Sequence, residues 1–167
     1  MTDALHTAGM WENTLFVWTT DNGSPVTGGG SNHPLKGGKG SNWEGGCRVP
    51  TFVTGGILPA QQRGKIHNGL IAISDWHATI LTLAGVDPSA GEPAAPSPLD
   101  AVDAWPWISG VSDSSSRHEL IYDHHMYPTS QSCLNVTTKR AGAGCLYGAI
   151  QRDGWKLILG TEHNAGT

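Results

Sequence analysis

Charged residues are scarce in this sequence, and their scarcity excludes several classes of protein. Of the 167 residues, 14% are charged, 10 are Lys or Arg, and the net charge is −4. Since no basic patch is present, we expect no nucleic-acid partner. No apolar run approaches the roughly 20 residues that cross a membrane, so no membrane span is predicted. The opening stretch, residues 1–5, is neither basic nor long and apolar, so we predict no signal peptide there.

Cysteine is also rare, with an odd count of 3. No C-x-x-C pair and no Cys/His zinc spacing occurs, which argues against a zinc site. Cys133 and Cys145 stand in one polar stretch, where either a local disulfide or two free thiols fits the spacing. Cys47 lies between a glycine and an arginine and is expected to be a small packed residue.

Glycine and tryptophan are abundant, with 23 and 7 residues, and 10 prolines accompany them. This composition is typical of a loop-rich globular protein rather than a disordered chain. The length fits one domain, or one domain with a small appendage. Because the chain starts within an amphipathic helical pattern and stops just after a strand pattern, we expect a fragment of a longer protein.

Apolar runs and turn signals predict an α/β layered arrangement in the first part of the chain. The expected elements are a helix end at 2–9, strands at 14–19 and 49–53, and a helix at 76–84. The run at 14–19 is apolar on both faces, which is typical of a buried strand in a parallel or mixed sheet. Ser74-Asp75 predicts a helix cap, and Trp76, Ile80, Leu83 and Ala84 share one helical face.

The second part of the chain predicts a small antiparallel sheet. A proline-rich connection at 86–100 and a helical turn at 105–108 precede a strand at 119–122. Residues 147–152 and 155–159 flank Asp153-Gly154, a pair that favours the tight type I′ turn of a β-hairpin. Residues 128–145 are expected to form an irregular loop.

A possible site follows the strand at 14–19. Asp21 and Asn22 offer a carboxylate and an amide oxygen where ligands of open α/β sheets collect, and both suit Ca²⁺ or Mg²⁺. Two ligands are too few for a complete site, and Asp-Asn-Gly is equally a turn signal. Lys36 and Lys39, in the glycine-rich loop that follows, are either solvated or partners of a tetrahedral oxyanion.

Other candidates carry weaker signals. His33 in the loop and His124 at the end of a predicted strand are candidate substrate contacts, or simply exposed histidines. Asn135-Val136-Thr137 is an N-glycosylation sequon in a predicted loop. The sequence has neither a P-loop nor a G-x-S-x-G motif, and no Ser-His-Asp set can be assigned.

Three stretches in one order resemble a known family. NTLFVWTTDNG, PLKGGKGSNWEGGCRVP and ISDWHATILTLAG are similar to the type I sulfatases of the alkaline phosphatase superfamily, and most of all to the arylsulfatase B-like (N-acetylgalactosamine 4-sulfatase-like) group. The resemblance implies the C-terminal part of an alkaline phosphatase-like mixed-sheet α/β sandwich, with a small antiparallel subdomain. Residues 1–100 would belong to the α/β domain, with the metal and sulfate loop at 20–48, and residues 101–167 to an incomplete β subdomain.

The resemblance also implies roles by position. Asp21 and Asn22 match two ligands of the family's divalent metal site, usually Ca²⁺, and Lys39 matches the lysine that contacts the substrate sulfate. The W-E-G-G-C-R-V-P stretch matches a mainly structural loop. In this family a formylglycine, made from a C/S-x-P-x-R motif, attacks the sulfur. Since this chain contains no such motif, the nucleophile and the other metal ligands would lie upstream, and the chain alone would be inactive.

The expected function is therefore part of a sulfuric ester hydrolase that acts on a sulfated small molecule or sulfated glycan. Its expected location, inferred from the resemblance, is the secretory pathway, either extracellular or lysosomal. Two alternatives remain open: a phosphoesterase of the same superfamily, and a truncated remnant without catalytic activity. The sequence does not fix the oligomeric state.

Overall fold

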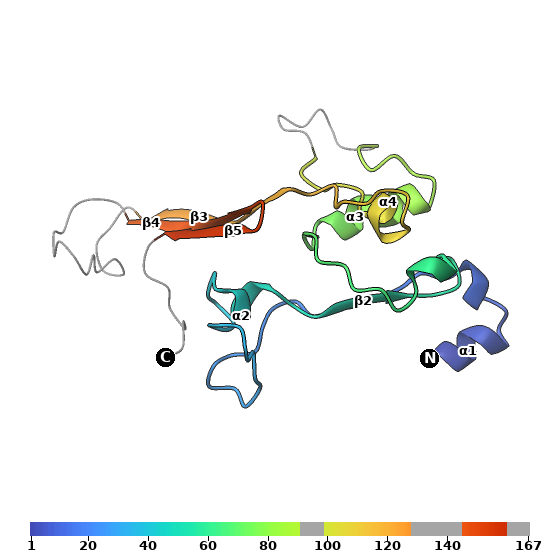
Figure 1. Ribbon diagram of the computed structural model, residues 1–167, viewed down its shortest axis with the longest axis horizontal. Coiled ribbons are helices and arrows are strands. Elements are labelled where there is room, and N and C mark those ends of the chain that lie inside the picture. The colour runs from blue at the N-terminus through green and yellow to red at the C-terminus, as the bar shows by residue number, and fades with distance from the viewer. Residues whose placement is uncertain (91–98, 128–144, 160–167) are drawn as a thin grey trace. The chain divides into compact units, whose positions relative to one another are not determined.

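The computed structural model describes residues 1–90, 99–127 and 145–159, with side chains at all of these except 123–127 and 145–147. Its helices are α1 (Thr2–Thr7), η1 (Trp11–Asn13), α2 (Glu44–Cys47), η2 (Ala60–Gln62), α3 (Asp75–Leu83) and α4 (Trp105–Ile108). Its strands are β1 (Phe16–Thr19), β2 (Thr51–Thr54), β3 (Glu119–Tyr127), β4 (Cys145–Arg152) and β5 (Trp155–Leu159) (Figure 1). The mixed α/β class is as predicted.

The chain forms two compact units that are interleaved in sequence. One consists of Met1–Val17 and Val53–His118, and the other of Trp18–Phe52 with the described part of Glu119–Thr167. Each unit takes residues from both predicted segments, 1–100 and 101–167. These units do not correspond to the two predicted segments, so they do not test the predicted division at residue 100, which stays a prediction.

The core of the first unit lies around Trp76 of α3. Its buried residues are Leu58, Trp76, Ala104 and Ile108, against which Val17, Val53, Ile71 and Trp105 pack. The predicted core face of α3 is wrong in part, because Ile80 is 53% exposed while Thr79 is fully buried. The helix thus turns polar side chains inward, and these need partners of their own.

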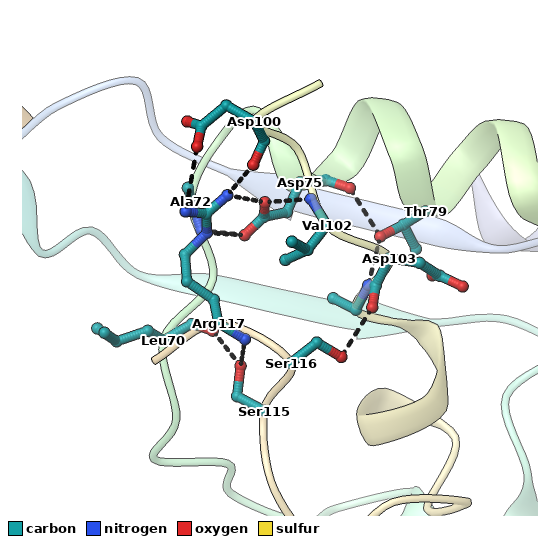
Figure 2. A network of polar contacts seen from close by, with 11 residues as sticks. Leu70, Ala72, Asp75, Thr79, Asp100, Val102, Asp103, Ser115, Ser116 and Arg117 are labelled. Carbon is teal, nitrogen blue, oxygen red and sulfur yellow. Dashed lines mark hydrogen bonds and ion pairs between the residues drawn. The ribbon is translucent and has the colours of Figure 1, made fainter. Parts of the chain in front are cut away.

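Those partners form a network around Asp75, shown in Figure 2. Asp75 is completely buried, and its carboxylate takes two hydrogen bonds from Arg117, at 2.8 Å from Nε and 2.6 Å from Nη2. The backbone N–H groups of Ala72 and Val102 donate to the same carboxylate at 2.7 and 3.0 Å. The hydrogen bonds to Asp75 raise the pKa of Arg117 above its usual value. A buried charge is tolerated when it is paired and hydrogen-bonded in this way.

The predicted helix cap is confirmed only in its position. Ser74 stands at the N-cap of α3 but makes no side-chain capping hydrogen bond, and Asp75 is the first helical residue. Thr79 extends the network, since its hydroxyl donates to Asp75 O at 2.7 Å and accepts the N–H of Ala104 at 2.9 Å. Asp75 therefore joins α3 to the segment before α4 instead of closing the end of its own helix.

The second unit contains the predicted antiparallel sheet, in the order β3-β4-β5 (Figure 1). Asp153 and Gly154 have φ of 49° and 82°, which confirms the tight hairpin turn between β4 and β5. Strand β3 is longer than predicted and has an irregularity between Ile121 and Asp123. Along β5 the exposed and half-buried residues alternate, so Lys156 and Ile158 share the more buried face.

Strands β1 and β2 form a separate two-stranded sheet. The ring of Trp18 stacks on that of Phe52 with centroids 5.4 Å apart, and the hydroxyls of Thr19 and Thr51 are 2.7 Å apart. The prediction that the first strand is buried on both faces is wrong for the described chain, since Trp18 is 43% exposed. The strand nevertheless ends at Thr19, as predicted, two residues before Asp21.

Several predictions lie outside the described residues. Cys133 and Asn135 are among them, and Cys145 begins β4 without a described side chain, so the disulfide and the glycosylation site remain predictions. Among the helices that the structure does describe, none has the length and apolar character needed to cross a membrane.

The Asp75 network yields a prediction for stability. Asp75→Asn removes the charge opposite Arg117, whose side chain is 8% exposed, and we expect a loss of about 3–5 kcal/mol in the free energy of unfolding. The matched control is Asp153→Asn, at a turn position where the side chain is 71% exposed and the change should stay within about 0.5 kcal/mol. Urea unfolding measures both, and equal losses would contradict the structural role given to Asp75.

Candidate functional site

The candidate site is built on a loop whose backbone segments touch directly. A Cβ placed on Gly23 would lie 1.7 Å from Gly45 O, and one placed on Gly45 would lie 2.3 Å from Gly37 O. Only glycine fits such approaches. Two hydrogen bonds complete the contact: Gly23 N donates to Gly46 O at 3.0 Å, and Gly45 N donates to Lys36 O at 2.7 Å. The glycines of this loop thus serve packing rather than flexibility.

Asn32 fixes the first half of the loop. Its Oδ1 accepts the N–H of Ser24 at 2.8 Å, and its Nδ2 donates to Ser24 O at 2.7 Å and to Gly37 O at 3.0 Å. Ser24 O also accepts the backbone N–H of Lys39 at 3.1 Å. One asparagine side chain therefore ties together the two stretches that carry the candidate metal and sulfate residues.

Asp21 and Asn22 lie two and three residues after the end of β1, at the start of this loop. Asp21 is exposed, and its Oδ1 accepts the N–H of Asn22 at 2.9 Å. Asn22 donates from Nδ2 to Gly23 O at 3.0 Å, which leaves its amide oxygen on the other side of the group. Within the described contacts, one carboxylate oxygen of Asp21 and the amide oxygen of Asn22 remain as possible metal ligands. Hard oxygen donors of this kind suit Ca²⁺ or Mg²⁺, so the residues fit such a cation.

The two donors do not make a complete cation site. Ca²⁺ takes about 6–8 oxygen ligands. In the part of the chain that the structure describes, no three His, Cys, Asp or Glu side chains are grouped so as to hold a metal ion. Asp21 and Asn22 would therefore supply only part of a coordination shell.

The two lysines of the loop are both exposed. The ammonium of Lys36 lies 4.3 Å from the centroid of the Trp43 ring, a cation–π contact that occupies it within the loop. Lys39 is exposed, and its backbone N–H donates a hydrogen bond to Ser24 O. Ser24 is three residues after Asp21 in the sequence. The structure therefore brings the backbone of Lys39 beside the Asp21-Asn22 turn.

The histidine candidates are not brought into this arrangement. His33 is exposed in the same loop, and His124 lies in β3 without a described side chain. Cys47 is half-buried, and its thiol donates to Ser41 O at 3.3 Å, consistent with a packed residue. His33 and His124 as substrate contacts remain predictions.

A second group of charges, which the sequence did not reveal, joins the first residue of α2 to the C-terminal sheet. Lys156 Nζ lies 2.8 Å from Glu44 Oε1 and 3.8 Å from the centroid of the Tyr122 ring. The Tyr122 hydroxyl donates to Gln151 Oε1. Burial, together with the nearby Glu44 carboxylate, raises the pKa of Tyr122 far above its usual value. The sequence signal available for this group is the alternation along residues 155–159, which places Lys156 on the same strand face as Ile158.

Comparisons with known proteins agree with the motif pattern. A family model described as Sulfatase matches residues 1–86. Mouse arylsulfatase J is 34% identical over 165 residues, covering 96% of this chain and 26% of that protein. Mouse steryl-sulfatase is 32% identical over 130 residues, covering 72% and 19%. Dog N-acetylgalactosamine-6-sulfatase is 35% identical over 104 residues, covering 59% and 18%.

A solved structure shares the fold. The crystal structure of Ps i-CgsB in complex with k-i-k-neocarrahexaose superposes with a TM-score of 0.69 at 25% identity, covering 95% of this chain and 30% of that one. The chain spans about a quarter or less of the length of the curated relatives named above. Together these comparisons confirm the resemblance inferred from the three motifs.

The packing of the loop yields a second prediction. Gly23→Ala places a methyl group on the carbonyl of Gly45. Because the clash is with backbone rather than with a flexible side chain, we expect a loss of about 3 kcal/mol in the free energy of unfolding. Gly28→Ala is the control in the same loop, since its methyl would meet only the Pro25 ring at 3.2 Å and should change stability by about 1 kcal/mol or less. Denaturant unfolding that gave the same loss for both would refute the close contact.

The raised pKa of Tyr122 predicts a pH dependence. As the pH rises, the unfolded state loses the phenol proton of Tyr122 first, because its pKa there is 10.0. The folded state keeps that proton to a higher pH. Stability from this group is therefore complete below about pH 10 and falls as the pH rises beyond that. Tyr122→Phe should make unfolding less sensitive to pH in this range. The difference in phenolate absorbance between the unaltered protein and the Tyr122→Phe variant measures the ionisation of Tyr122. Ionisation of Tyr122 near pH 10 in the folded protein would refute the raised pKa.

Proposed function

The chain belongs to the sulfatase family, and from that membership we propose that it forms part of the active site of a sulfuric ester hydrolase. The observation that carries this proposal is the single hydrogen-bonded loop that holds the Asp21-Asn22 turn and Lys39. In that loop two oxygen atoms that can bind a cation and the side chain of Lys39 occur together. This pairing suits a tetrahedral dianion or monoester bound between a metal ion and a lysine.

We assign a role to each residue. Asp21 and Asn22 would hold a Ca²⁺ through one oxygen each, with the remaining ligands supplied from outside this chain. The cation, when bound, acts as a Lewis acid on the sulfate oxygens. Lys39 would pair its ammonium with another sulfate oxygen and offset the negative charge that develops there. The glycine contacts keep these groups in place before the substrate arrives, so little reorganisation is needed during the reaction.

The nucleophile is assigned to a region outside this chain. No C-x-P-x-R or S-x-P-x-R motif occurs in the 167 residues, and the relatives are much longer than the chain. We propose a formylglycine in that other region, and a chain that is inactive by itself. The substrate would be a sulfated small molecule or sulfated glycan, and the location the secretory pathway, either extracellular or lysosomal.

The test compares variants of the full-length protein on an aryl sulfate. Asp21→Ala and Lys39→Ala should each lower kcat/KM by about 10²–10³-fold, because each removes charge stabilisation in the transition state. Lys36→Ala is the matched control: a lysine of the same loop, held on Trp43, whose loss should change kcat/KM by less than about three-fold.

Three results would contradict this proposal. The first is full activity of Asp21→Ala, which would remove the residue from the metal site. The second is an equal loss in the Lys36 and Lys39 variants, which would show that the loop merely needs positive charge. The third is faster turnover of an aryl phosphate than of the matching aryl sulfate, which would favour a phosphoesterase.

A further inference from the structure

Lys156 carries a charge that the proposed chemistry does not use. Its side chain is 12% exposed, and its ammonium is 2.8 Å from Glu44 Oε1 and 3.8 Å from the centroid of the Tyr122 ring. Arg152, on the adjoining strand of the same hairpin, pairs with Glu119 at 3.4 Å with its side chain 69% exposed. Solvent and side-chain entropy weaken the exposed pair far more than the shielded one. The Lys156–Glu44 pair is thus suited to fix a position.

What this pair fixes is the start of α2. Glu44 is the first residue of that helix, and Gly45 and Gly46 follow it directly. Gly46 O accepts the N–H of Gly23 at 3.0 Å, and Gly45 O lies against the Cα of Gly23, where a Cβ would be 1.7 Å away. A shift of α2 would therefore displace the backbone immediately after Asn22.

We infer that Lys156 is a positioning residue for the Asp21-Asn22 turn: it holds Glu44, and through α2 and the Gly46–Gly23 hydrogen bond it fixes the two candidate metal ligands. The link joins residues 112 positions apart in sequence, so the hairpin of the C-terminal sheet supports a loop at the other end of the chain. Lys156 itself touches neither ligand nor substrate in this account. The inference rests on the proposed function where the readout is calcium binding.

A metal site depends on groups that hold its ligands in place as well as on the ligands themselves. Residues that hydrogen-bond directly to metal ligands typically contribute about 10–100-fold to metal affinity, and for the less direct link from Lys156 we expect the lower end of that range. The turn is short and Asp21 is exposed, so its order comes from the backbone contacts with α2 rather than from burial of the carboxylate. Loosening α2 should thus weaken the metal without removing either donor.

The experiment uses the full-length protein with three substitutions. Lys156→Met keeps the aliphatic stem and removes the charge, Lys156→Arg keeps the charge, and Arg152→Met removes the exposed charge on the adjoining strand. Calorimetric titration with Ca²⁺ alone measures metal affinity. Hydrogen exchange followed by mass spectrometry, on peptides that contain Gly23, measures the order of the turn in the absence of metal.

The expected result is specific to the charge of Lys156. Lys156→Met should weaken Ca²⁺ binding about ten-fold and speed exchange in the peptides with Gly23. Lys156→Arg should restore most of both, and Arg152→Met should match the unaltered protein. Restoration by arginine separates a charge-dependent link from general damage to the sheet.

Two outcomes would overturn the inference. One is unchanged exchange at Gly23 in Lys156→Met, and the other is an equal effect of Lys156→Met and Arg152→Met on both readouts. If the unaltered protein binds no Ca²⁺, the proposed function fails, while the exchange measurement still decides whether Lys156 orders the turn. Failure of the two proposals is therefore distinguishable.

Discussion

The candidate site depends on the contact between the backbones of Gly23 and Gly45. At that point no side chain separates the segment after β1 from α2, since a single added carbon would lie 1.7 Å from a carbonyl oxygen. The contact places the Asp21-Asn22 turn on a rigid support although Asp21 itself is exposed. Because the loop from β1 to α2 closes on itself in this way, Lys39 is also held near the turn through Ser24 O. Pre-organised charges cost less reorganisation in a reaction than mobile ones.

Long-range charge pairs support each unit of the chain in a similar manner. In the first unit, buried Asp75 and Arg117 join α3 to the segments around α4, as Figure 2 shows. In the second, Lys156 joins the β4–β5 hairpin to α2 through Glu44. Each pair links stretches that are distant in sequence. Asp75 and Arg117 are both nearly buried, and in the second pair the side chain of Lys156 is mostly shielded from water. Removing one partner of such a shielded pair leaves an uncompensated charge, so each pair favours the arrangement in which both partners meet.

Local features of the fold were predictable from the sequence, and long-range ones were not. The Asp153-Gly154 hairpin followed from the backbone preferences of two residues, and α3 followed from its pattern of apolar residues. The buried face of α3 was misjudged because Asp75 and Thr79 are satisfied by groups 25–42 residues away. Spacing left Asp21-Asn22 as either a turn or a cation pair, and the order of three motifs favoured the cation pair. No local pattern pairs Lys156 with a residue 112 positions earlier.

The most direct measurement is a crystal structure of the full-length protein with Ca²⁺ and an unreactive sulfate ester. The account predicts a Ca²⁺ ion with one oxygen of Asp21 and the amide oxygen of Asn22 among its ligands, at about 2.3–2.6 Å. It also predicts the ammonium of Lys39 within about 3 Å of a sulfate oxygen. A cation bound without Asp21 and Asn22, or a sulfate group remote from Lys39, would contradict the central claim.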